Sequence, residues 1–513
     1  MSQPGNLSAL LEAQAARFGA KSIFRFLDSG ADWSFADLER RARRVAAQLD
    51  PVAPGARVGI LAEDRAAFCD AFFGAHARGV VPVPLGVAGE VGSAAWRAVA
   101  RDRVRRFGLE AVLTDPDAVD ELAAALAPTP VVGVDGARGD PVATLGVAPH
   151  AFVQPSSGTT GDPKGVVIGH GALLANLAAI GEHWDLGPTD VGLSWLPLFH
   201  DMGLIGTMIN ALYLGGTLYH WPTASFLRSP GRYLQLVGEL DVTMTVAPPF
   251  ALQLVTRRQS RRASTVDLSG LRSILVGAEL IRPEVVTGFT DAFAPYGLRP
   301  TAMTPSYGLA EATVGVTAMP AGSPLRVVDL DPHPAVSCGS PLPGVEVACT
   351  EAGEVVVRSP ALMEGYLDDP AATAATVVDG WLHTGDTGVL VDGELVVLGR
   401  TKEMINRGGL RLPASDFELA LAGVEGLLPD RVVAFADTSD TGPGGPTERV
   451  VVLAESRWTD RADEAVLGAR ARLAAAGLPV DVVELVRPGF IPRTTSGKLR
   501  RAAARDAWIA TRA

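Results

Sequence analysis

The sequence predicts an α/β protein with more than one domain. Up to about residue 326, short Val- and Ile-rich runs alternate with Ala- and Leu-rich stretches of helical length. From there on, Gly- and Val-rich pieces predict a small β-rich subdomain, and the stretch beyond residue 400 carries strands of its own. With 513 residues, of which 47% are hydrophobic and 20% charged, the chain is long enough for two or three domains.

The strands before residue 326 fall into two groups, each with helical stretches between the strands. The first group is predicted at 56–61, 80–85, 110–115 and 130–135, and the second at 217–221, 242–249, 272–279 and 299–308. Strands separated by helices of this length predict parallel sheets joined by crossover helices. We therefore expect two parallel-sheet subdomains in the N-terminal part of the chain.

The N-terminal residues 1–22 predict an amphipathic helix rather than a targeting segment. They have no basic region, and one helical face would carry Leu7, Leu10, Leu11, Ala15 and Phe18. No apolar run reaches the roughly 18 to 20 residues that span a bilayer. The expected protein is soluble and cytoplasmic.

Charge and cysteine content exclude several classes of function. The net charge of −12 and the isoelectric point near 5.2 argue against a nucleic-acid-binding protein, which would present a basic face. The three cysteines Cys69, Cys338 and Cys349 form no CxxC pair, so neither a zinc site nor a disulfide framework is indicated.

The segment "SSGTTGDPKGV" (156–166) is a candidate phosphate-binding loop. Its glycines would let backbone N–H groups approach an anion, while its hydroxyls and Lys164 add donors and charge. It is not a Walker loop, which requires Ser or Thr after the lysine, because Gly165 stands there. A solvated surface turn is the alternative for such a Ser/Thr/Gly cluster.

Several short motifs together resemble the adenylate-forming superfamily. In chain order they are "SSGTTGDPKGV" (156–166), "WLPLFHDMGLIG" (195–206), "VGAEL" (276–280), "PSYGLAEAT" (305–313), "WLHTGDTG" (381–388), "GRTKEMI" (399–405) and "PRTTSGK" (492–498). That family includes acyl-CoA synthetases, fatty acyl-AMP ligases, luciferases and the adenylation domains of peptide synthetases. The His-Asp-Met-Gly-Leu-Ile run at 200–205 is most similar to the fatty acyl-AMP ligases.

The resemblance implies that ATP and Mg²⁺ activate a carboxylic acid as its acyl-adenylate, with release of pyrophosphate. Ser157, Thr159, Thr160 and Lys164 would hold the β- and γ-phosphates, and Glu311 would bind magnesium. A solvated residue at a helix start is the other interpretation of Glu311.

The same resemblance implies a nucleotide site. Tyr307 and the backbone around Gly277, Ala278 and Glu279 would form the adenine slot, Asp386 would bind the ribose hydroxyls, and Arg400 would accompany it. Gly308 is also assigned to the nucleotide site. Without the family order, "TGD" would be interpreted as a turn, and a Tyr after Pro-Ser as part of the core.

The resemblance also implies a mobile C-terminal unit. We expect an N-terminal domain at 1–399 and a small α+β lid domain at 400–513, which rotates about a hinge at Lys402. Lys498 would enter the site for adenylation and stabilise the charge between the acid and the α-phosphate. The alternative interpretation of Lys498 is an ordinary surface lysine.

His200 and a group of apolar residues are candidates for the acid pocket. Because His200 replaces the aspartate that peptide-synthetase domains use for the substrate amine, we expect an acid without an α-amine. His200 would gate the pocket or lie near the carboxylate, the alternative being a buried histidine that is simply hydrogen-bonded. The pocket candidates are Trp195, Met202, Gly203 and Phe250, each of which could equally be core. A fatty, short branched or aryl acid would fit.

The thiol that receives the acyl group is the least defined part of the prediction. We expect the phosphopantetheine arm of a carrier protein in trans, with "RRQSRR" (257–262) as a candidate docking patch. Coenzyme A is the alternative, because the family's inserted segment is short here (318–336) and Gly408 and Gly409 depart from the acyl-AMP ligase pattern. A catalytically silent nucleotide-binding homologue is a further alternative, which the presence of Lys164, Glu311, Asp386, Arg400 and Lys498 disfavours.

Overall fold

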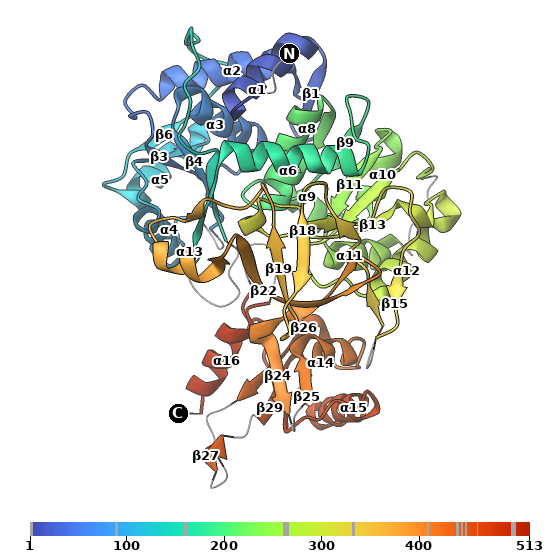
Figure 1. The fold of residues 1–513 in the computed structure, drawn as a ribbon. Coiled ribbons are helices and arrows are strands. Elements are labelled where there is room, and N and C mark those ends of the chain that lie inside the picture. Colours follow the sequence, from blue (N-terminus) through green and yellow to red (C-terminus); the bar gives the residue numbers. More distant parts are fainter. Residues whose placement is uncertain are drawn as a thin grey trace.

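The computed structural model describes residues 4–87, 91–156, 163–259, 266–330, 334–407, 410–437, 441–442, 445–446, 449–458, 460–493 and 499–512. A large body formed by the chain up to about residue 400 lies above a smaller unit formed by the rest (Figure 1). The predicted α/β class, with parallel-sheet subdomains, is confirmed.

The first subdomain contains a parallel sheet with the order β4-β3-β5-β6. Its strands are β3 (Arg57–Ile60), β4 (Val81–Pro84), β5 (Ala111–Thr114) and β6 (Val131–Gly133), as the sequence predicted. The helices between and before them are α2 (Phe35–Gln48), α3 (Arg65–Arg78), α4 (Ala94–Arg106) and α5 (Val119–Leu126). Ser34 and Asp37 form a capping box that fixes the start of α2.

The second subdomain is built on a nine-stranded sheet with the order β17-β14-β13-β12-β11-β9-β10-β1-β2. The strands from β13 to β1 run parallel. They are β1 (Ser22–Phe26), β9 (Val191–Ser194), β10 (Thr217–His220), β11 (Met244–Ala247), β12 (Ser273–Val276) and β13 (Met303–Tyr307); the antiparallel edges are β2 (Asp32–Ser34), β14 (Thr317–Ala318) and β17 (Ser340–Pro341). The helices are α6 (His170–His183), α7 (Asp201–Gly203), α8 (Asn210–Leu214), α9 (Thr223–Arg228), α10 (Arg232–Glu239), α11 (Pro249–Gln259) and α12 (Pro283–Phe293).

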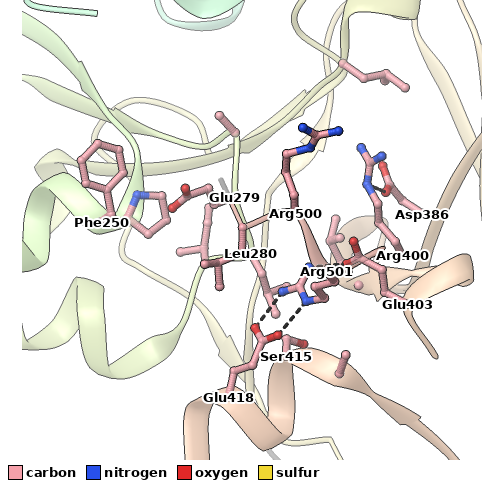
Figure 2. A pocket seen from close by; sticks show the side chains of 18 of the residues that line it. Phe250, Glu279, Leu280, Asp386, Arg400, Glu403, Ser415, Glu418, Arg500 and Arg501 are labelled. Atoms are coloured by element: carbon pink, nitrogen blue, oxygen red, sulfur yellow. Dashed lines mark hydrogen bonds and ion pairs between the residues drawn. The ribbon is translucent and has the colours of Figure 1, made fainter. Parts of the chain in front are cut away.

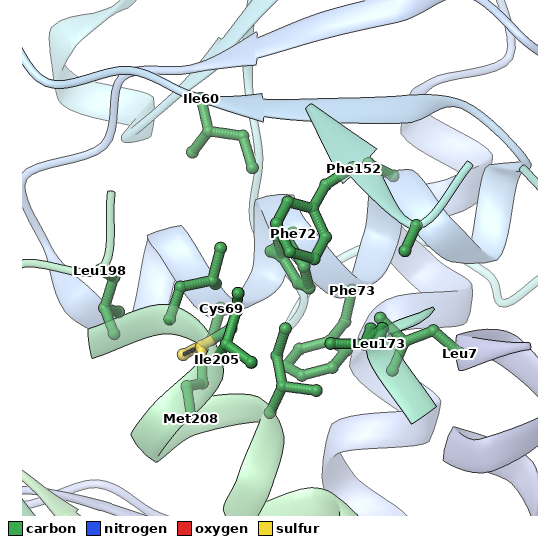
Figure 3. Close-up of a cluster of buried hydrophobic side chains, with 14 of the residues drawn as sticks. Leu7, Ile60, Cys69, Phe72, Phe73, Phe152, Leu173, Leu198, Ile205 and Met208 are labelled. Atoms are coloured by element: carbon green, nitrogen blue, oxygen red, sulfur yellow. Dashed lines mark hydrogen bonds between the residues drawn. The ribbon is translucent and has the colours of Figure 1, made fainter. Parts of the chain in front are cut away.

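A hydrophobic core centred on α3 joins the two subdomains. Helix α3 is buried along almost its whole length, and it begins at the Asp64 cap and ends at Gly79 in a left-handed conformation. Phe72 and Phe73 of this helix pack at right angles, with ring centroids 5.4 Å apart. Around them lie the N-terminal helix α1 (Leu7–Phe18), α6 and the π-helical segment Leu204–Ile209 (Figure 3). The predicted N-terminal helix is therefore confirmed as part of this core.

The predicted β-rich subdomain is also present, and it follows the nine-stranded sheet. Its strands are β18 (Glu346–Cys349), β19 (Glu354–Arg358), β21 (Val377–Val378), β22 (Trp381–Val391) and β23 (Glu394–Arg400), all antiparallel. A separate antiparallel sheet contains β7 (Phe152–Pro155), β8 (Gly165–Ile168) and β20 (Gly365–Tyr366), and α13 (Pro370–Thr376) follows it. A short ribbon pairs β15 (Val327–Val328) with β16 (Ala335–Val336).

The C-terminal unit has three small sheets of its own, β24-β25, β26-β29-β30 and β27-β28, and two small hydrophobic clusters drawn from residues beyond 404. Its strands are β24 (Met404–Arg407), β25 (Leu410–Pro413), β26 (Leu427–Asp437), β27 (Thr441–Gly442), β28 (Gly445–Pro446), β29 (Arg449–Ser456) and β30 (Val482–Val486), and its helices are α14 (Ala414–Ala420), α15 (Ala462–Ala475) and α16 (Arg501–Ala510). Among the described residues, no helix is both long and apolar enough to cross a membrane.

Candidate functional site

A large cavity of about 2080 Å³ lies where the body meets the C-terminal unit. Its walls include segments that directly follow β11, β12 and β13, so the cavity opens at the carboxyl ends of these parallel strands. In open α/β sheets this is the edge at which ligands bind, because the connections from neighbouring strands diverge there. The remaining walls come from β22, β23 and the C-terminal unit.

Most of the predicted site residues line this cavity. They are Lys164, His200, Phe250, Ala278, Glu279, Tyr307, Gly308, Glu311, Asp386, Arg400 and Lys402. Met202 and Gly277 line a smaller cavity that adjoins it. Ser157, Thr159, Thr160 and Lys498 lie outside the described residues, although Leu499, next to Lys498 in the chain, lines the large cavity.

Two predicted residues lie elsewhere. Trp195 directly follows β9 and is buried in the hydrophobic core, where its ring stacks on Phe226 with centroids 3.8 Å apart. Gly203 packs against the Pro197 carbonyl, and a Cβ there would come within 2.3 Å of that oxygen. Neither lines either cavity. Both residues pack tightly against neighbouring core atoms in the segment after β9, so the prediction that they line the acid pocket is wrong.

Asp386 forms the centre of one polar group in the cavity. It is 6% exposed, the Tyr307 hydroxyl donates to its Oδ2 at 2.7 Å, and Arg400 Nε lies 3.2 Å from its Oδ1. Asp386 and Arg400 face each other because β22 and β23 pair at this register. Burial and then the charge of Asp386 raise the pKa of Tyr307 well above its ordinary value, so the phenol stays neutral and donates.

Lys164, Glu311 and Tyr366 form a second polar group. The Tyr366 hydroxyl donates to Glu311 Oε1 at 2.9 Å, and Lys164 Nζ lies 4.1 Å from the Tyr366 ring centroid. Burial, followed by the charge of Glu311, raises the pKa of Tyr366. The ends of the candidate phosphate loop are held together, since Ser156 N donates to the Lys164 carbonyl at 2.8 Å. The lysine at the end of this loop and the carboxylate of Glu311 therefore both contact Tyr366.

Sequence reasoning missed two residues that position Asp386. Glu354 Oε2 lies 2.9 Å from His383 Nδ1, and Glu354 Oε1 accepts a hydrogen bond from Gly385 N at 3.0 Å. Both bonds fix the turn immediately before Asp386, in which Gly385 has a φ of +71°. His383 stands within the motif "WLHTGDTG", so that motif could have suggested it, whereas Glu354 and Tyr366 belong to none of the motifs.

The C-terminal unit contributes a half-buried ion-pair cluster to the cavity wall. Arg501 lies 2.6 Å from both Glu403 and Glu418, and Figure 2 shows this group below Arg500, Arg400 and Asp386. Burial alone would lower the pKa of Arg501, but the two carboxylates raise it. From the body, Arg282 donates to the Ser415 carbonyl at 3.1 Å. No motif or spacing indicated this contact between the two parts.

His200 lines the large cavity at the position where α7 begins. Its Nδ1 is 2.6 Å from Asp201 Oδ1, and its side chain is 15% exposed. Asp201 lines both cavities. His200 is therefore a partly exposed, paired side chain on the wall of the large cavity, beside the passage between the two.

The geometry also fits a magnesium ion bound through one protein carboxylate. Among the described residues, no group of three or more His, Cys, Asp or Glu could hold a metal by itself. Mg²⁺ commonly takes one or two carboxylates and completes its shell with phosphate oxygens and water. Glu311 faces the cavity beside Lys164 and is suited to this mode.

The model of the AMP-binding enzyme family matches residues 11–367, which include both polar groups except Asp386 and Arg400. This chain belongs to the AMP-binding enzyme family. As a member, it is an adenylate-forming enzyme, and enzymes of this family use ATP. The predicted family is thus confirmed.

Individual relatives include proteins with different final products. Long-chain-fatty-acid–AMP ligase FadD26 of Mycobacterium tuberculosis is 32% identical over 575 residues, covering 97% of this chain and 96% of the relative. A Caulobacter vibrioides protein that carries the name of an acyl-CoA synthetase is 32% identical over 505 residues, covering 90% of this chain and 87% of the relative. A solved structure from studies of fatty acyl-adenylate ligases of E. coli and L. pneumophila matches with a TM-score of 0.88 at 27% identity, covering 100% of both chains.

Proposed function

We propose that this protein converts a carboxylic acid and ATP into an acyl-adenylate and then transfers the acyl group to the phosphopantetheine thiol of a carrier protein in trans. The observation that carries the first half is the presence of both polar groups in one cavity at the strand ends. Lys164 and Glu311 both contact Tyr366, which supports binding of a triphosphate there, and Asp386 accepts a hydrogen bond from Tyr307, which supports binding of a nucleoside.

Each group has a definite task in this proposal. A carboxylate and the α-phosphate repel each other, so the site must neutralise charge and hold both in line. Lys164, with Ser157, Thr159 and Thr160, holds the β- and γ-phosphates, and Lys498 stabilises the charge that develops at the α-phosphate. Asp386 accepts from the ribose hydroxyls, with Arg400 beside its carboxylate.

The adenine is placed between Tyr307 and the backbone of Gly277, Ala278 and Glu279, with Gly308 at its edge. Magnesium, held by Glu311, supplies charge neutralisation between the phosphate oxygens when it is bound. The acid enters past His200 and places its tail in the smaller cavity lined by Met202, with Phe250 on the wall outside.

The second half of the proposal requires the C-terminal unit to move. We place the domain boundary at 399/400 and the hinge at Lys402, which stands in a short turn between β23 and β24. Rotation there would withdraw Lys498 and admit a thiol. The exposed Arg257 and Arg258 at the end of α11 support a docking patch for an acidic carrier, although the rest of "RRQSRR" lies outside the described residues.

Exchange of labelled pyrophosphate into ATP tests the first half. We expect exchange that depends on one or more members of a panel of fatty, short branched and aryl acids. Exchange with none of them would favour the silent nucleotide-binding homologue.

The acceptor is tested separately, with the preferred acid, ATP and either coenzyme A or a phosphopantetheinylated carrier protein. Mass spectrometry should show thioester on the carrier. The similarity to FadD26 favours this outcome, while the similarity to the Caulobacter protein favours coenzyme A. Rapid formation of acyl-CoA without carrier loading would show that coenzyme A, and not a carrier protein, is the acceptor.

A further inference from the structure

The smaller cavity runs inward from the large cavity. The two share Asp201, Ala278, Ser306, Tyr307 and Gly308 at their junction. Beyond this junction the smaller cavity, of about 60 Å³, lies between α6, the helix that begins at α7 and the nine-stranded sheet. Its wall is mostly apolar and includes Ile180, Trp184, Met244, Val246, Leu275 and Leu342.

Asn210 is a polar residue on this wall whose side chain is not fully hydrogen-bonded. Asn210 is 2% exposed, and its Oδ1 is buried without a hydrogen-bond partner among the described residues. The neighbouring polar side chains are paired, because Ser306 Oγ donates to the Val276 carbonyl at 3.1 Å and Thr317 Oγ1 to the Cys338 carbonyl at 2.8 Å. Buried polar groups are nearly always paired, so an amide oxygen on a cavity wall without a partner among the described residues indicates a partner that occupies the cavity.

The local helix geometry creates the space in front of Asn210. Met202, Gly206 and Asn210 all line the smaller cavity, at successive spacings of four residues. A Cβ added at Gly206 would have no heavy atom within 4 Å, which leaves room between the two larger side chains. The π-helical segment Leu204–Ile209 precedes Asn210, and such segments are frequent at functional sites.

We propose that Asn210 recognises the distal end of the acid, and that the substrate is a short carboxylic acid with a hydroxyl group at that end. A hydroxyl can donate to the amide oxygen or accept from the amide nitrogen, so it satisfies either orientation of the side chain. A cavity of about 60 Å³ holds roughly four to six water-sized groups, which suits a short chain or a single ring. This inference rests on the proposed adenylation of an acid in the adjoining cavity.

Matched pairs of acids test it, with kcat/KM measured from acid-dependent pyrophosphate release. The pairs are 6-hydroxyhexanoate with heptanoate, and 4-hydroxybenzoate with 4-methylbenzoate, in which a hydroxyl replaces a methyl group of similar size. In at least one pair, we expect the wild-type protein to prefer the hydroxy acid by about 10- to 100-fold, because the methyl group leaves the buried amide unpaired.

Variants then attribute the preference to Asn210. Asn210→Leu, and the smaller Asn210→Ala as a second variant that keeps helix propensity, should abolish or reverse the preference. Thr207→Val is the matched control, since Thr207 is buried in the same helix, bonds to the Gly203 carbonyl and lines neither cavity. It should keep the wild-type preference. Thermal denaturation provides a readout without turnover: the hydroxy acid should raise the Tm of the wild type but not of Asn210→Leu.

Two results would overturn the inference while leaving the proposed function in place. One is adenylation of some acid with no preference for the hydroxy member of either pair. The other is an equal loss for all four acids in both Asn210 variants, which would assign Asn210 a purely structural role. Absence of pyrophosphate release with every acid tested would instead reject the proposed function, and this inference with it.

Discussion

Asp386 shows how the surrounding residues hold a single carboxylate in one orientation. Its two oxygens already face Tyr307 and Arg400, and Glu354 fixes the turn before it through Gly385. A carboxylate held this way keeps its orientation, and Asp386 lines the large cavity.

Asp386→Asn should therefore weaken ATP binding more than it destabilises the fold. Hydrogen bonds to a charged group contribute about 1.5–3 kcal/mol, so the KM for ATP in pyrophosphate release should rise on the order of 10- to 100-fold. Asp392→Asn serves as a control, because Asp392 is 79% exposed, pairs with Arg326 and lies outside the cavity. An unchanged KM for ATP would remove Asp386 from the nucleotide site.

Lys498→Ala should separate the two half-reactions. We expect a loss of about 100- to 1,000-fold in acid-dependent pyrophosphate release, because a preorganised charge at the α-phosphate is removed. Thioester formation from a supplied acyl-adenylate should remain largely intact, as followed by mass spectrometry. Arg505→Ala, an exposed basic residue of α16, is the control. Equal losses in both half-reactions would contradict the proposed alternation of the C-terminal unit.

At the scale of elements, both ends of the segment 318–336 are packed into the hydrophobic core. Ala318 and Val336 are 1% and 2% exposed and pack in hydrophobic clusters, and β15 pairs with β16 within the segment. Removing all of it would expose core surface. Only the part of the segment between the buried residues Ala318 and Val336 is therefore a suitable target for deletion.

Replacing residues 321–334 by a short Gly-Ser linker should raise any residual activity with coenzyme A, if the segment restrains the C-terminal unit. The acid-dependent release of pyrophosphate should stay close to that of the wild type, since the cavity residues Val336 and Cys338 are kept. Acyl-CoA formation, measured by mass spectrometry, checks the change. Unaltered use of coenzyme A would show that the segment exerts no such restraint.

For the molecule as a whole, the C-terminal unit contacts the body beside the cavity. Arg282 of the body reaches the Ser415 carbonyl, and within the C-terminal unit Arg501 ties Glu403, beside the proposed hinge, to Glu418 of α14. These contacts complete the cavity with residues from both parts. A rotation at Lys402 would open it.

Lys402→Pro should impede that rotation. Proline fixes φ near −65°, a value compatible with the helical turn Thr401–Glu403 in which Lys402 now lies. Conformations that proline cannot adopt cost about 3 kcal/mol, so carrier loading should fall by on the order of 100-fold while pyrophosphate release persists. Lys402→Ala is the control for loss of the side chain. Normal carrier loading by Lys402→Pro would place the hinge elsewhere.

Much of the fold could be predicted because its signals are local. The strands at 56–61, 80–85 and 110–115 and the N-terminal helix follow from periodicity, which depends on neighbouring residues alone. Sheet membership is not local. Strand β1 (Ser22–Phe26) precedes the first subdomain in the chain but pairs with β10 (Thr217–His220) in the second sheet, and no spacing rule indicates that partner.

By itself, the sequence determined the adenylate-forming family, the candidate nucleotide residues and the alternation of strands with helices. Motifs and periodicity depend only on residues that are close together in the chain. Only the tertiary structure assigned Trp195 to the core, paired Tyr366 with Glu311 and placed the Asn210 Oδ1 on a cavity wall with no partner among the described residues. Each of these depends on side chains brought together from distant segments by packing. The burial and pairing of a polar group are properties of its surroundings, and folding alone creates those surroundings.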